Sequence, residues 1–96
     1  MERGFNEIEI IFAEDECSSL AYVDKKAAGE CQYQEKDDKW YIIHTGVREE
    51  FGGHGIAKLL VLKIVEEARK RGIKIVPICS YAQKVLSKDE YKDIVE

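Results

Sequence analysis

The chain has 96 residues, which is enough for one domain with a single modest core, and we expect residues 1–96 to form that domain. A hydrophobic fraction of 45% excludes a disordered polar chain, and no run of about 18 apolar residues suits a membrane span. Without a membrane span or a basic-then-apolar leader, we expect a cytoplasmic protein. Fifteen basic residues against 19 acidic ones give a net charge of −4 without a basic stripe, so we expect no nucleic-acid partner.

The cysteines and histidines do not predict a metal site. The chain has an odd number of cysteines, Cys17, Cys31 and Cys79, and no two of them have Cys-x-x-Cys spacing. This argues against a disulfide framework and a structural zinc site. His44 and His54 have no acidic partner at the spacing of metal ligands. We therefore expect at least one free thiol and no bound metal.

Four strands are predicted in the first half of the chain. Apolar and polar residues alternate over residues 8–12, and residues 20–23 form a second strand. A third strand covers residues 27–34, and its alternation places these residues on one face: Ala27, Gly29, Cys31 and Tyr33. Residues 40–43 are apolar and uncharged, so we expect this fourth strand to be central and covered on both faces. The short charged turns between the strands predict an antiparallel meander.

A long amphipathic helix is predicted over about residues 54–71, ended by Gly72. Its expected core-facing residues recur at steps of three and four: Ile56, Leu59, Leu60, Ile64 and Ala68. Residues 73–78 then form a fifth strand, and this strand, helix, strand succession indicates a crossover between two parallel strands. Because Pro77 has no N–H to donate, we expect the fifth strand to separate from its neighbour near its end.

The remaining residues, 81–95, are predicted to be helical with a break near Ser87. The predicted class is therefore α/β, more narrowly α+β. It has a mostly antiparallel mixed sheet, one parallel strand pair linked by a long helix, and short C-terminal helices.

Three glycines, Gly52, Gly53 and Gly55, stand directly before the long helix. Backbone N–H groups in the first turn of a helix lack intrahelical partners, and the helix dipole adds partial positive charge. Without Cβ atoms, the glycines allow positive φ and a close approach of an anion to the backbone. We predict that this junction holds a phosphate or pyrophosphate. Ligands bind beyond the carboxyl ends of parallel strands, where residues 44–47 and 79–81 should lie.

The succession of strand, glycine loop, long helix, strand and short helix resembles the GNAT family of N-acetyltransferases over residues 7–87. The loop pattern of that family, Q/R-x-x-G-x-G/A, is similar to residues 52–57, although Gly52 stands where Gln or Arg is expected. His-Thr-Gly-Val at residues 44–47 and Cys-Ser-Tyr-Ala at residues 79–82 resemble the small, single-domain members.

The resemblance implies that acetyl-coenzyme A is the acyl donor and that an amine of a protein, polyamine or small metabolite is the acceptor. It implies that Val47 contacts the pantetheine arm. The segment that it implies for the pyrophosphate comprises Gly52, Gly53, His54, Gly55, Ile56, Ala57 and Lys58. Within this segment, the side chain of His54 is expected to stay in solvent. Larger members place a tyrosine acid where this chain has Leu86, so that acid is absent or replaced.

The candidate catalytic residues are His44, Cys79 and Tyr81. A lysine-like amine has a pKa near 10.4, so a base would help it react near pH 7; His44 could be that base or a strand-end cap. Cys79 could form an acyl-thioester or simply line the cleft. Tyr81 could protonate the departing thiolate or only pack. Two rival functions stay open: a non-catalytic module that binds coenzyme A, and a structural domain whose glycine loop is only a turn.

Overall fold

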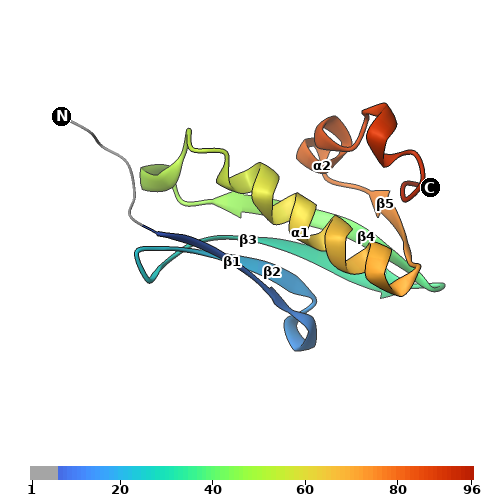
Figure 1. Cartoon of the computed structure of the whole chain (residues 1–96), viewed down its shortest axis with the longest axis horizontal. Helices are drawn as coiled ribbons and strands as arrows, with labels where there is room; N and C mark the ends of the chain where they lie inside the picture. The colour runs from blue at the N-terminus through green and yellow to red at the C-terminus, as the bar shows by residue number, and fades with distance from the viewer. Residues whose placement is uncertain (1–6) are drawn as a thin grey trace.

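The computed structural model describes residues 7–96 as a five-stranded sheet packed against one long helix, α1 (Ile56–Arg71) (Figure 1). The strands have the same order in space as in sequence: β1 (Ile8–Ala13), β2 (Ser18–Val23), β3 (Lys26–Lys36), β4 (Lys39–Val47) and β5 (Lys74–Pro77). Strands β1 to β4 form an antiparallel meander, and β5 pairs parallel with β4 through the α1 crossover. The predicted fold class is confirmed. No helix within residues 7–96 is long and apolar enough to cross a lipid bilayer.

Short helical segments follow β5, as predicted, but they do not reach the end of the chain. These are α2 (Ser80–Val85) and the 3₁₀ turn η3 (Asp89–Tyr91). The prediction of helix up to residue 95 is wrong, because Val95 forms a parallel bridge with Ile75. The N–H of Ile75 donates to the carbonyl of Ile94, and the N–H of Glu96 donates to the carbonyl of Ile75. The last residues therefore cover the outer edge of β5.

Helix α1 buries one side of its surface against the sheet. Its buried residues are Ile56, Leu60, Val61, Ile64, Val65 and Ala68. Leu59, which we predicted to face the core, is 42% exposed. It lies about 100° around the helix from Leu60, at the margin of the buried stripe. Gly72 ends the helix with a φ of 67°, as predicted, and its N–H donates to the carbonyl of Arg69.

The C-terminal end of α1 is tied to the sheet by aromatic and charged contacts. The Trp40 ring stacks on Tyr33 at 4.2 Å and on Phe12 at 5.7 Å between centroids. The Arg71 guanidinium lies over the Trp40 ring and forms an ion pair with Glu14, which lies in the 3₁₀ turn after β1. Because both ends of a rigid helix move together, these contacts also set the direction of its N-terminus.

Only one face of β4 is packed against α1. Trp40 and Ile42 are fully buried on that face, whereas Ile43 is 37% exposed. Our expectation that residues 40–43 would be covered on both faces is wrong. An uncharged strand predicted burial on both sides, but in a meander with a single long helix only one face of the sheet receives it.

A bulge in β3 corrects another prediction. Ala21 pairs with Gly29 and Tyr22 pairs with Ala27, so Ala28 is an extra residue in β3. Ala28 is buried, while Ala27, which we placed on the core face, is exposed. A bulge interrupts the strict alternation of side chains that the prediction assumed.

Candidate functional site

The glycine loop leads directly into the N-terminus of α1. It follows the 3₁₀ turn η2 (Glu49–Phe51), whose Phe51 side chain is buried. Gly53 and Gly55 have φ angles of 80° and 76°, and a Cβ atom at either position would meet no atom of the described residues, 7–96, within 4 Å. Gly52, in contrast, is extended, with a φ of −68°. The space beside the loop is therefore open to a ligand, and the backbone conformation favours glycine at two of the three positions.

The first turn of α1 presents backbone N–H groups to this open space. Gly55 is the N-cap, and no side chain within residues 7–96 caps the helix with a hydrogen bond. The N–H of Leu59 donates to the carbonyl of Gly55, so the N–H groups of Ile56, Ala57 and Lys58 have no intrahelical acceptor. The Ile56 side chain is buried, which limits its role to the backbone. This arrangement, together with the helix dipole, suits an anion.

Strands β4 and β5 separate beside the loop. Their parallel pairing ends where Ile42 is opposite Pro77, as the position of the proline predicted. The N–H groups of Ile78 and Cys79 both donate to the carbonyl of Ile42, at 2.9 and 3.0 Å. Beyond this point β4 continues over residues 43–47 with β3 as its strand neighbour in the described chain. The edge of β4 that faces away from β3 is therefore left without a strand partner.

A second bulge lies where the strands separate. Gln32 pairs with His44 and Tyr33 pairs with Ile42, so Ile43 is an extra residue in β4. A bulge bends its strand and changes the direction of the side chains that follow. It therefore sets which side chains of the His-Thr-Gly-Val segment face α1.

Thr45 brings two thiols together at the strand separation. Its hydroxyl lies 3.5 Å from the Sγ atoms of both Cys31 and Cys79. Cys31 is fully buried, and burial raises the pKa of its thiol to about 11, so it stays protonated. Cys79 is half-buried, and its sulfur accepts a hydrogen bond from the N–H of Ala82 at the start of α2. Of these two thiols, Cys79 is the one open to a ligand.

His44 lies on the sheet face opposite Thr45, because successive residues of a strand point to opposite faces. Its Nε2 atom is 3.0 Å from Oε2 of Glu30, and the two side chains are 50% and 41% exposed. A Cβ atom at Gly46 would come within 2.9 Å of the same Nε2. The absence of a side chain at Gly46 therefore lets the imidazole contact Glu30. The structure brings His44 and Cys79 to the same strand separation, but on opposite sides of it.

Tyr81 lines a different part of the site, a cavity of about 220 Å³ between α1 and α2. Burial raises the pKa of its hydroxyl, which keeps the phenol protonated. The same cavity is lined by Lys58, Lys84 and Lys88. None of the ion pairs within residues 7–96 involves these lysines. Positive charge therefore accumulates next to the glycine loop.

Sequence reasoning missed several of these groups. Glu30 is 14 residues from His44 and reaches it only through the pairing of β3 with β4. Thr45 lies inside a motif that we quoted, but nothing local showed that it contacts two thiols. Lys84 lies on α2 and Lys88 follows the end of that helix, and no local signal showed that both line one cavity with Lys58. His54, as expected, lies at an exposed position of the loop.

Residues 19–94 match the family model of the GCN5-related N-acetyl-transferases. The match spans most of the 96 residues and agrees with the mixed sheet, the glycine loop and the separated strands. The chain belongs to this family. A comparison with curated protein sequences gave no significant match.

Solved structures carry the same fold. A GCN5-like protein from Staphylococcus aureus, inferred to be an N-acetyltransferase, is 33% identical over 95% of this chain and 90% of its own, with a TM-score of 0.73. A GCN5-related N-acetyltransferase from Sphaerobacter thermophilus is 30% identical over 62% of this chain and 20% of its own, with a TM-score of 0.58. Arabidopsis thaliana Naa50, in complex with a bisubstrate analogue that contains CoA, is 26% identical over 62% of this chain and 44% of its own, with a TM-score of 0.50. The chain thus spans less than half of the last two proteins.

Proposed function

We propose that this chain binds acetyl-coenzyme A and transfers its acetyl group to an amine. The observation that carries the proposal is the open glycine loop at the uncapped N-terminus of α1, directly beside the separation of β4 from β5. Membership of the GCN5-related family supports it, as does the CoA-containing analogue bound by the similar Arabidopsis protein.

The residues present fit such a donor. The amides of residues 53–58 would hold its pyrophosphate, because they lie in the loop and first turn where N–H groups lack intrahelical partners. Lys58, Lys84 and Lys88 would add positive charge for its phosphates. Val47 and the unpaired edge of β4 would offer peptide groups to the pantetheine arm, in the manner of an added strand.

When bound, the donor supplies an activated thioester carbonyl. In direct transfer, the amine nitrogen bonds to the acyl carbon, and the carbon–sulfur bond breaks with its electron pair on sulfur. His44 would accept the proton from the attacking nitrogen through Nδ1, because its Nε2–H donates to the Glu30 carboxylate, which would also stabilise the imidazolium. That proton then returns to the departing sulfur, directly or from the Tyr81 hydroxyl. These roles make His44 the base of the direct route.

A covalent route is the alternative for the same site. The sulfur of Cys79 would bond to the acyl carbon, coenzyme A would leave as the thiol, and the amine would then displace Cys79. The hydrogen bond from Ala82 N–H would support negative charge on this sulfur. Cys31 is not a candidate, because its pKa of about 11 leaves it without thiolate near pH 7.

The test combines calorimetric titration with acetyl-coenzyme A and a thiol-release assay with a panel of amines. We expect uptake of the donor and release of free thiol with at least one amine. Folded protein that takes up no donor would contradict the proposal, whereas uptake without turnover would identify a binding module.

The two routes are separated by intact-protein mass spectrometry and by Cys79→Ala. A covalent route adds an acetyl group to the wild-type chain, and Cys79→Ala then abolishes turnover with a modest effect on donor affinity. Cys17→Ala is a matched control, because Cys17 is also half-buried but ends the 3₁₀ turn after β1. Turnover without any acetylated protein would leave the direct route.

A further inference from the structure

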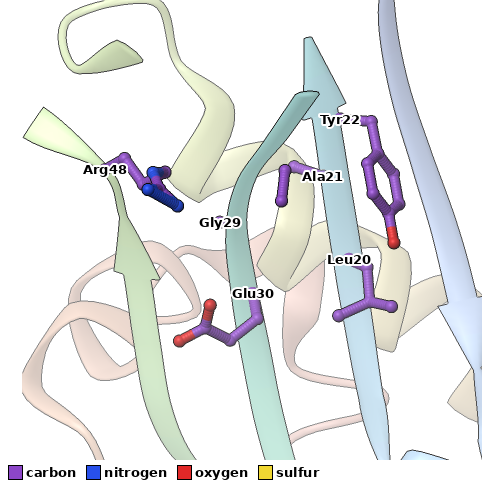
Figure 2. A pocket seen from close by; sticks show the side chains of 7 residues that line it. Leu20, Ala21, Tyr22, Gly29, Glu30 and Arg48 are labelled. Carbon is purple, nitrogen blue, oxygen red and sulfur yellow. The ribbon is translucent and has the colours of Figure 1, made fainter. Parts of the chain in front are cut away.

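A second cavity lies next to His44, on the sheet face that α1 does not cover. It has a volume of about 130 Å³ and is lined by residues of β2 and β3 and by Arg48, which directly follows β4 (Figure 2). Leu20 and Tyr22 form one side of it, and Glu30 and Arg48 bring charged groups to the other. A cavity of this size is smaller than the pockets that enclose drug-sized ligands, so it suits one end of a small molecule.

The two charged side chains in this cavity do not neutralise each other. Among the ion pairs within residues 7–96, Glu30 pairs with His44 alone and Arg48 with no carboxylate. The backbone of Arg48 is held by a hydrogen bond of 2.7 Å from its N–H to the carbonyl of Ala28. Figure 2 shows its guanidinium extended toward Gly29, which has no side chain to fill the space. The cavity therefore offers one cationic and one anionic contact to the same ligand.

Glu30 connects this cavity to the proposed chemistry. Its carboxylate lines the cavity and also lies 3.0 Å from Nε2 of His44. An ammonium group attracted to Glu30 would therefore arrive beside the base that must take its proton. A carboxylate of the same molecule would find the planar guanidinium of Arg48, which can donate two parallel hydrogen bonds to it.

We propose that this cavity binds the acetyl acceptor, and that the acceptor carries a carboxylate next to its primary amine, as an α-amino acid does. The inference rests on the proposed function. Glu30 attracts the amine, Arg48 binds the carboxylate, and Leu20 and Tyr22 contact the rest of the molecule. After His44 takes one proton from the ammonium group, the amine nitrogen bonds to the acyl carbon and the carbon–sulfur bond breaks with its electron pair on sulfur. The second proton lost by the nitrogen goes to that sulfur, so coenzyme A leaves as the thiol.

The test compares amino acids with amines that lack only the carboxylate: alanine with ethylamine, phenylalanine with phenethylamine, and lysine with cadaverine. For at least one pair we expect kcat/KM to be at least about 10-fold higher for the amino acid, the size of one charge-assisted hydrogen bond. Arg48→Gln should remove this preference. Lys36→Gln makes the same charge change at the far end of β3 and should preserve it. Equal rates within every pair, or a preference that survives Arg48→Gln, would overturn the inference.

A binding measurement keeps this test independent of turnover. In the presence of coenzyme A, the backbone amide resonances of Gly29 and Gly46 should shift on titration with the amino acid and not with its decarboxylated counterpart, and Arg48→Gln should suppress the shift. If no amino acid moves these resonances, the inference is wrong. Failure of the proposed function has a different signature, because it appears as absent uptake of acetyl-coenzyme A whatever the amine.

Discussion

Gly55→Ala, with Gly72→Ala as its matched control, tests whether the loop backbone binds the donor. The two glycines flank α1, with φ angles of 76° and 67°, and an added Cβ at either position would meet no atom within 4 Å in the part of the chain that the structure describes. The strain in both variants therefore comes from the left-handed backbone alone, about 1–2 kcal/mol for an L-residue. For a domain of this size, that loss lowers Tm by about 4–16 °C. We expect urea unfolding to give similar losses of stability for the two variants.

The variants should differ in their affinity for acetyl-coenzyme A. An alanine that moves Gly55 toward negative φ redirects the amides of residues 56–58. Each lost hydrogen bond to a phosphate costs about 1.5–3 kcal/mol, which raises Kd about 10- to 150-fold. Gly72 lies at the other end of a 16-residue helix, about 24 Å away, so the Gly72→Ala substitution should leave the Kd for acetyl-coenzyme A unchanged. Calorimetric titration below the Tm of both variants measures the difference. Equal affinities for the two variants would refute the loop reasoning.

Three further predictions concern stability. Gly29→Ala should lower the free energy of unfolding in urea by about 1–3 kcal/mol, because its Cβ would lie 2.5 Å from the carbonyl oxygen of Gly46; an unchanged midpoint would contradict this. Hydrogen bonding to Arg71 lowers the pKa of Glu14, so the pair stabilises the fold above the ordinary pKa of 4.5 and loses this contribution as pH falls through the lower folded-state value. Arg71→Met should therefore lower stability at pH 7 and weaken its decline below about pH 4.5; parallel pH profiles for variant and wild type would argue against it. Trp40→Phe should cost well under the roughly 3–5 kcal/mol of a Trp-to-Ala change, because the buried Nε1 has no hydrogen-bond partner within residues 7–96; a larger loss in thermal unfolding would show that packing dominates.

Much of the architecture was predictable because its signals are local. The apolar stripe of α1, its C-terminal Gly72 and the alternation along β1 each depend on residues within a few positions of one another. Pro77 lacks a donor wherever the chain places it, so the end of the β4–β5 pairing also followed from one residue. The glycine loop belongs to the same class, since its composition and its place before a helix were enough to predict an anion site.

The contacts within the site depend on register, which no local signal specifies. A bulge at Ile43 decides which side chains of the following segment face α1, and a shift of one residue would send them to the other face. The contact of Glu30 with His44 requires β3 and β4 to pair in that register.

The sequence by itself thus determined the elements of this protein, their order and the loop suited to an anion, because periodicity, turn residues and helix ends act over short distances. Only the tertiary structure decided which charged and thiol groups come together: the contact of Glu30 with His44, the position of Thr45 between Cys31 and Cys79, and the place of Arg48 beside an open cavity. These side-chain contacts join residues that are 14 to 34 positions apart in the sequence, and the pairing of the strands, with its bulges, is the physical interaction that aligns them.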